Sequence, residues 1–135
     1  MITIPKFTIA KVDDHDPQGV ILTEKLLKHL AVRHGELKAG YYLQKNSRKS
    51  FQAYDISHFT SMPELEEGEL RCTLVIADTP RGKLLQEAYH NNEVDFRVIC
   101  DIDLVDNEGN ASISGIKYIM AIDHDMKSEE VAENN

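Results

Sequence analysis

The stretch VDFRVICDIDL, residues 94–104, carries the clearest structural signal in this chain of 135 residues. Its even positions are apolar, and its odd positions between 95 and 103 are charged except for Ile99. A period of two is typical of a β-strand that buries one face. The polar turn DNEGN, 106–110, separates it from residues 111–123, and we predict that the two segments form an antiparallel hairpin.

Three other segments are predicted to be strands: residues 2–12, 51–59 and 69–77. The last of these alternates cleanly between apolar and polar side chains, which indicates one buried face. Pro5 lies in the first segment and has no backbone N–H to donate to a neighbouring strand. We therefore expect that strand at an edge of the sheet.

Two helices are predicted from their capping residues and apolar periodicity. Thr23 precedes a stripe of leucines at helical spacing, and Gly35 is the expected stop. Thr79 is the expected N-cap of the second helix, and Pro80 takes its first position, where a missing N–H has no cost. Each helix is expected to turn one apolar face toward the sheet.

These elements predict an α+β fold, a mostly antiparallel β-sheet with two helices. Residues 1–125 are expected to form a single domain, and residues 126–135 a disordered acidic tail. Residues 38–50 are polar, with Gly40 and several basic side chains, and are predicted to be a loop. That loop is also where we would look for a contact surface.

The formal net charge of −8 argues against a nucleic-acid partner, because such affinity comes from Lys and Arg neutralising phosphates. No stretch approaches the roughly 20 apolar residues that span a bilayer, so no membrane partner is expected. Cys72 and Cys100 both lie in apolar runs, which favours reduced, buried thiols in an intracellular setting. No phosphate-binding loop or metal-binding motif is present, so no cofactor is expected.

A few residues are candidates for chemistry. His58 follows Asp55 and Ser57 closely, which is a weak indication of acid–base work; a hydrogen-bonded histidine in a strand is the alternative. Asp101 and Asp103 share one face of the predicted strand and are weak candidates for holding a cation. The acidic clusters DDHD and DHD, residues 13–16 and 123–125, are expected to be exposed to water.

One part of the chain resembles a known family. The segments DISH, residues 55–58, and LVIADTPRGKLL, residues 74–85, resemble the middle of the tailed-phage prohead (capsid maturation) proteases. Upstream, GV at 19–20 and GEL at 35–37 are similar to that family's approach to its Gly-Glu-Leu-x-His-Pro motif. The resemblance covers residues 19–105 and implies a protease-like scaffold.

The chain departs from that family at the catalytic positions. The family's histidine falls at Ala39, and its nucleophilic serine falls at Ile99. Neither side chain can attack a carbonyl or take a proton. Cys100 follows Ile99 and is a weak candidate nucleophile, but the alternation places it on the apolar face, where a thiol stays inert. The glycines that would shape an oxyanion hole are replaced by Arg97 and Ile102.

The resemblance and the departures together imply a non-catalytic, prohead-protease-like phage protein. It would act by binding a capsid, scaffold or protease subunit during capsid assembly, or as a virion component. Its location would be the cytoplasm of the infected host, or the virion. The alternatives are an acidic phage-encoded inhibitor of a host enzyme or defence system, and a hydrolase that uses His58. A homo-oligomer is also open, if the strand at 94–104 lies at a sheet edge and pairs with a second copy.

Overall fold

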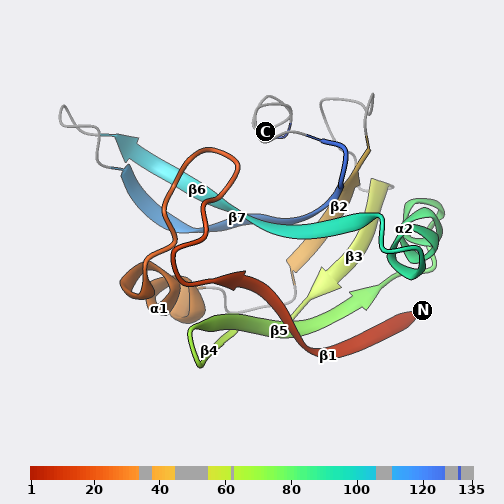
Figure 1. The fold of residues 1–135 in the computed structure, drawn as a ribbon, viewed down its shortest axis with the longest axis horizontal. Helices are drawn as coiled ribbons and strands as arrows, with labels where there is room; N and C mark the ends of the chain where they lie inside the picture. The colour runs from red at the N-terminus through yellow and green to blue at the C-terminus, as the bar shows by residue number, and fades with distance from the viewer. Residues whose placement is uncertain (34–37, 45–54, 62, 106–110, 127–130, 132–135) are drawn as a thin grey trace.

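The computed structural model describes residues 1–33, 38–44, 55–61, 63–105, 111–126 and 131. It contains two helices and seven strands within those residues (Figure 1). Their bounds are β1 (Ile2–Lys11), α1 (Glu24–Arg33), β2 (Lys38–Leu43), β3 (Ile56–Thr60), β4 (Glu64–Glu66), β5 (Glu69–Ile76), α2 (Pro80–His90), β6 (Val94–Val105) and β7 (Ala111–Asp123).

All seven strands belong to one sheet, in the order β1-β5-β3-β2-β7-β6, with β4 paired to β5. The pairs are antiparallel except for β2 and β7, which run parallel where Tyr42 lies opposite Ala121 and Leu43 opposite Ile122. The predicted α+β fold, with a mostly antiparallel sheet and two helices, is therefore confirmed. The strand β1 lies at one edge of the sheet, as Pro5 predicts, and β6 lies at the other.

The hairpin predicted from the alternating segments is present. β6 and β7 pair from Val94 opposite Asp123 to Val105 opposite Ala111, and the register shifts at three places along the ladder. Val98 and Cys100 are almost fully buried, as the alternation requires. The turn expected at residues 106–110 lies outside the described residues.

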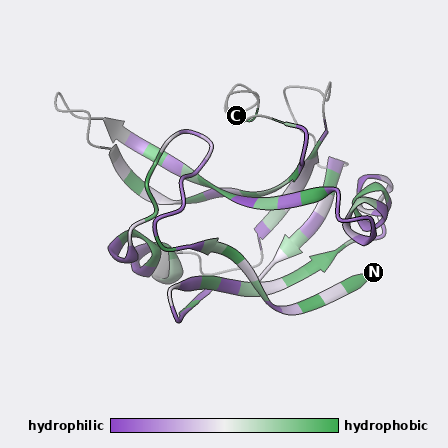
Figure 2. Cartoon of the chain, viewed as in Figure 1, coloured by the Kyte–Doolittle hydropathy of each residue, from purple (hydrophilic) through white to green (hydrophobic). Residues whose placement is uncertain are grey.

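The sheet curls so that its two edge strands approach each other. The rings of Phe7 on β1 and Phe96 on β6 meet edge to face, with centroids 5.1 Å apart. The helices lie at opposite ends of the curled sheet (Figure 1). Leu27 and Leu30 of α1 join a core cluster with β1, β5, β6 and β7, and Leu85 of α2 joins a second one. Apolar and polar residues alternate along several strands of the ribbon (Figure 2).

The loop predicted for residues 38–50 is wrong over its first six residues. Lys38–Leu43 forms β2, a strand in the interior of the sheet between β3 and β7. Tyr42 and Leu43 are buried, and the Lys38 ammonium donates a hydrogen bond to the carbonyl oxygen of Ile116. Partial burial lowers the pKa of Lys38, and the charge of Asp101 opposes that shift. Residues 45–50 lie outside the described residues.

The short strand β4 was missed from the sequence. It forms a tight hairpin with β5 in which Glu66 pairs with Glu69. Both residues between them, Glu67 and Gly68, have positive φ, which is the geometry of a two-residue hairpin turn. The strand expected over residues 51–59 corresponds to β3, which runs from Ile56 to Thr60, and residues 51–54 lie outside the described part.

The helix start predicted at Thr23 is confirmed, because the Leu26 amide donates to the Thr23 hydroxyl oxygen at 3.1 Å. The expected stop at Gly35 falls outside the described residues. Of the tail expected to be disordered over 126–135, the structure describes Met126 and Val131: Val131 is 1% exposed in an apolar cluster, and Met126 packs against that cluster. The segments 127–130 and 132–135 are not described, so for them the tail stays a prediction.

Candidate functional site

His58 lies on β3 with its ring inside the curled sheet, and the ring passes over Gly40 of β2 to reach β7. Gly40 and His58 are cross-strand neighbours, and a Cβ placed on Gly40 would lie 2.1 Å from the His58 Nε2. That nitrogen is 2.6 Å from the carbonyl oxygen of Ile119 on β7. The missing side chain of Gly40 therefore makes room for a side-chain bridge between β3 and β7.

The hydrogen bonds determine which nitrogen of His58 carries the proton. A carbonyl oxygen only accepts, so Nε2 must donate to Ile119, and Nδ1 is left as an acceptor. The Ser57 hydroxyl lies 2.8 Å from Nδ1 and donates to it. Burial lowers the pKa of His58 to about 4, although the bond to Ile119 opposes this shift. The His58 imidazole is therefore neutral, and both of its nitrogens make hydrogen bonds.

Ser57 and His58 resemble a nucleophilic serine and its general base in composition, but both side chains are buried in the interior of the protein. Ser57 and His58 are both 0% exposed, and the ring of Phe96 meets the imidazole edge to face at 5.4 Å. A substrate carbonyl must approach within about 3–3.5 Å of a nucleophile, and this interior offers no such access. The geometry is that of a hydrogen-bonded core histidine, the alternative stated from the sequence.

Cys100 lies on the inner face of β6 and is 1% exposed. Burial and the neighbouring carboxylate of Asp16 raise its thiol pKa to about 12. Burial also raises the thiol pKa of Cys72, to about 11. A nucleophilic cysteine needs a lowered pKa and access to solvent, and Cys100 has neither.

Asp16 was expected to be exposed within the acidic cluster 13–16, and that expectation is wrong for this residue. Asp16 is 3% exposed, and its carboxylate accepts hydrogen bonds from the backbone amides of Gln18, Val20 and Cys100. The Gln18 side chain donates to the Cys100 carbonyl oxygen at 2.9 Å. Side chains of this loop thus take the place of a neighbouring strand and protect part of the exposed edge of β6.

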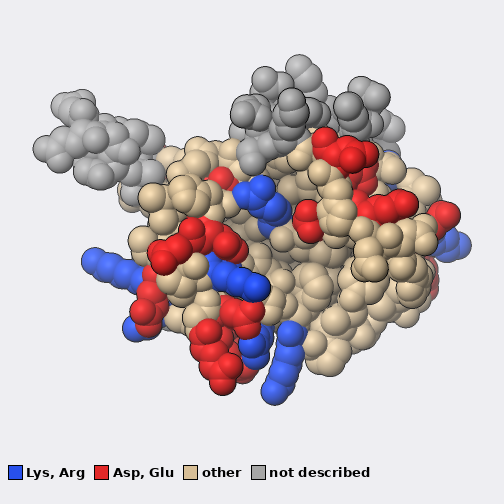
Figure 3. Space-filling model, in the orientation of Figure 1, with Lys and Arg blue, Asp and Glu red and all other residues tan. Residues whose placement is uncertain are grey.

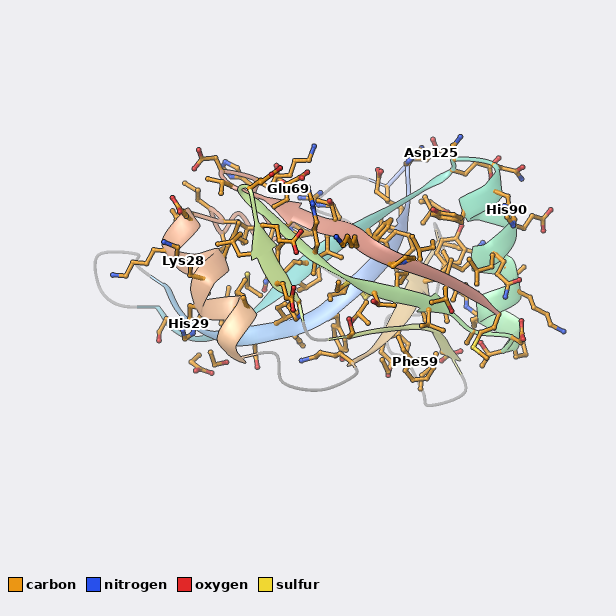
Figure 4. The ribbon with its side chains drawn as sticks, turned by 90° about the horizontal axis from the view of Figure 1, so that it is seen from below. Lys28, His29, Phe59, Glu69, His90 and Asp125 are labelled. Carbon is orange, nitrogen blue, oxygen red and sulfur yellow. The ribbon has the colours of Figure 1, made fainter. Side chains whose placement is uncertain are left out.

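Asp101 and Asp103 are both exposed on β6. Within the part of the chain that the structure describes, no three His, Cys, Asp or Glu side chains gather closely enough to hold a metal ion. His29 on α1 and His90 on α2 lie toward opposite ends of the molecule (Figure 4). The two aspartates therefore have no third ligand among the described residues.

The two positions where the resemblance would place catalytic groups lie on different strands. Ala39 is on β2 opposite Phe59, whereas Ile99 is on β6 opposite Tyr118. Ile99 is 0% exposed and packs with Met120. Both positions carry side chains without acid–base or nucleophilic chemistry.

The most specific part of the resemblance, DTPRGK at 78–83, has a structural role here. The Thr79 hydroxyl oxygen accepts a hydrogen bond from the Gly82 amide at 3.0 Å, and the same hydroxyl donates its proton to the Ile56 carbonyl oxygen at 2.6 Å. A Cβ on Gly82 would lie 2.1 Å from the Ala77 carbonyl oxygen, so only glycine fits. Arg81 donates to the Tyr42 carbonyl oxygen at 2.6 Å. The motif caps α2 and attaches it to β2 and β3.

We predict that Thr79→Ala lowers the free energy of unfolding by about 1–2 kcal/mol, because it removes both the cap and the bond to β3. Thr79→Ser keeps the hydroxyl and is the matched control, with less than half that loss. Urea denaturation at neutral pH measures both. Equal losses for the two variants would contradict the capping role.

A polar hollow of about 420 Å³ opens where β2 and β7 end and β6 begins. The Tyr42 hydroxyl donates to Asp123 in this hollow, and burial together with that carboxylate raises the Tyr42 pKa. At the margin of the hollow, the His124 Nε2 lies 3.1 Å from the Asp95 Oδ1. The hollow is lined by Tyr42, Gln44, Glu93, Asp123, His124 and Asp125. Three of these lining residues form the DHD cluster at 123–125, which was interpreted from the sequence as an exposed strand end.

No family model, no curated protein and no solved structure matches this chain. Among the described residues, neither helix has the length and apolar character needed to cross a membrane.

Proposed function

We propose that this protein is a non-catalytic, prohead-protease-like phage protein that acts by binding another protein. One observation on the two candidate catalytic side chains, His58 and Cys100, supports the absence of catalysis. Both side chains are enclosed, and their pKa values of about 4 and about 12 disfavour the imidazolium and the thiolate that catalysis would form. The phage setting is supported by the resemblance of residues 19–105 alone.

The proposed partner is a capsid, scaffold or protease subunit, met in the cytoplasm of the infected host or in the virion. The net charge of −8 supports a protein rather than a nucleic acid as that partner. Acidic and basic side chains are interspersed over the face in Figure 3, with acidic groups gathered near α1 and β4 and near the other end of the sheet.

An acidic inhibitor of a host enzyme or defence system is the second candidate. The net charge and the surface carboxylates favour it, since they would complement a basic site. The two candidates differ in where the protein is found. A structural role places it in purified proheads or virions, and an inhibitor stays free in the cytoplasm early in infection.

The test is to incubate the wild-type chain, Cys100→Ser and the matched control Cys72→Ser with labelled casein and a capsid–scaffold mixture. We expect turnover at background in all three, unchanged by serine or thiol blockers, and retention of the protein on the capsid–scaffold material. Turnover that Cys100→Ser or the thiol blocker removes would overturn the proposal. Turnover lost in a folded His58→Ala variant would favour the hydrolase instead.

A further inference from the structure

The outer edge of β6 presents backbone groups in the middle of the strand, at Val98. Val98 lies opposite Ile119 of β7, and the Ile119 carbonyl oxygen is turned away from β6, toward His58. Opposed residues of an antiparallel pair either exchange both of their hydrogen bonds or direct their backbone groups away from each other. The N–H and C=O of Val98 therefore face the outer edge of β6.

Cys100 shows how the same edge is closed two positions further along. It lies opposite Ile116, whose carbonyl oxygen also points away from β6. The Cys100 N–H donates to the Asp16 carboxylate at 3.1 Å, and the Cys100 carbonyl oxygen accepts from the Gln18 side chain at 2.9 Å. These side chains do for Cys100 what a neighbouring strand would do, and they end there.

The backbone of Val98 is buried without such partners. Val98 is 2% exposed, and buried N–H and C=O groups are almost always hydrogen-bonded. Within the part of the chain that the structure describes, no strand pairs with β6 on this side, and no hydrogen bond reaches these groups of Val98. Phe96 presents its backbone to the same edge, because the register does not shift between Val94 and Ile99. This part of the edge is a place where another strand can add.

A cavity of about 170 Å³ lies against the same part of the edge. Its apolar walls come from β1, from β6 and from the loop that precedes α1. They are formed by Ile9, Ala10, Leu22, Phe96 and Val98. Water alone would leave these walls unpacked, whereas an extended peptide supplies an N–H, a C=O and an apolar side chain together. The cavity and the open edge therefore fit the same occupant.

The rim of the cavity is charged. It is formed by Asp14, His15, Asp95 and Arg97, and the Arg97 guanidinium donates to the His15 carbonyl oxygen. Asp95 is next to Phe96 on β6, and its side chain is 65% exposed although it contacts His124. A strand added here would place one of its own outward side chains opposite Asp95, and opposite charges stabilise such a pair. The rim thus favours lysine or arginine beside the aliphatic side chain.

We propose that the edge of β6 at Phe96 and Val98 is a docking site for an extended segment of a partner protein. The segment pairs with β6 as an additional strand and places an aliphatic side chain in the cavity beside Leu22. A lysine or arginine next to that side chain lies opposite Asp95. This inference rests on the proposed protein-binding function and adds the place and the chemistry of the contact.

The first test is amide hydrogen exchange of the full-length, isotope-labelled chain, followed by NMR. The probes are two peptides of alternating lysine and valine, one of which carries N-methyl groups on its valines and cannot donate hydrogen bonds to β6. In the free chain, the amides of Phe96 and Val98 should exchange at least tenfold faster than that of Cys100. The unmodified peptide should slow both amides at least tenfold, and the N-methylated peptide should leave them unchanged.

The second test changes the rim. Asp95→Lys should weaken the binding of the unmodified peptide at least fivefold, measured by fluorescence anisotropy at physiological salt, where only nearby charges act strongly on one another. The matched control is Asp103→Lys, which makes the same change at another exposed aspartate of β6, beyond Cys100. That variant should bind within about twofold of the wild-type chain, because Asp103 does not line the cavity.

The docking site would be overturned if the amides of Phe96 and Val98 exchanged as slowly as that of Cys100 in the free chain, or if neither peptide changed them. Equal effects of the two peptides would rule out pairing with β6. Exchange that slows as the chain alone is concentrated would assign the edge to a second copy, against the proposed partner. If the wild-type chain is retained on capsid–scaffold material while the peptides have no effect, the proposed function stands and only this site is wrong.

Discussion

Gly40→Ala is expected to lower the free energy of unfolding by about 3 kcal/mol or more, and to leave little folded protein at 37 °C. The new Cβ would lie 2.1 Å from the His58 Nε2 and 2.6 Å from the Ile119 carbonyl oxygen, so the hydrogen bond between those two groups could not survive. An unpaired buried carbonyl and a displaced imidazole add their desolvation costs to the steric cost. Urea or thermal unfolding followed by circular dichroism measures the loss.

Gly19→Ala is the control for that substitution. Gly19 has a φ of +90°, which alanine adopts only with strain, but a Cβ there would meet no atom within 4 Å. We expect a loss of about 1–2 kcal/mol from the backbone conformation alone. If Gly40→Ala were no more damaging than Gly19→Ala, the bridge from β3 to β7 would not be a principal support of the sheet.

The same glycine shows why β2 was missed. Lys38, Gly40 and the polar run QKNSRKS at 44–50 favoured a loop, although Tyr41, Tyr42 and Leu43 between them include side chains that are typical of a strand. The reason for Gly40 lies in a contact with His58, eighteen positions further along the chain. Close approaches of this kind become visible only when the strands have been paired.

The β6–β7 hairpin was predictable because its signal is local. Every even position from 94 to 104 is apolar, and the partner segment has a clear alternating start. The one exception in that pattern, Ile99, carried information that the prediction did not use. An apolar residue at an outward position, facing the mixed run IKYIMAID at 116–123, indicates a strand pair buried on both faces.

The buried Asp16 could be predicted only in part. Its position before Pro17, Gln18 and Gly19 is typical of a turn in which the carboxylate accepts from backbone amides two and four residues on. Its third backbone contact, with the Cys100 amide, joins residues 84 apart. Through that contact the loop covers part of the edge of β6.

The pH dependence of stability is the second large effect that we expect, and it comes from His58. The pKa of His58 is about 4 in the folded chain, against 6.5 for an ordinary histidine. Between those values the unfolded chain binds a proton that the folded chain does not, so the free energy of unfolding falls as the pH falls. The stabilisation is complete above pH 6.5 and is lost by pH 4, a change of about 3 kcal/mol.

The measurement is urea denaturation of wild-type protein and His58→Gln at pH 7.5, 6.5, 5.5 and 4.5. The variant should be clearly less stable than the wild type at pH 7.5. Because glutamine does not titrate, the difference in stability should shrink steadily below pH 6.5. Carboxylates such as Glu69 and Asp78, whose pKa values are lowered, titrate in both proteins and cancel in the difference. His90→Gln, at an exposed histidine on α2, is the matched control and should follow the wild-type curve. A difference between wild type and His58→Gln that stays constant over this range would mean that folding does not shift the pKa of His58, and the buried neutral bridge to Ile119 would be wrong.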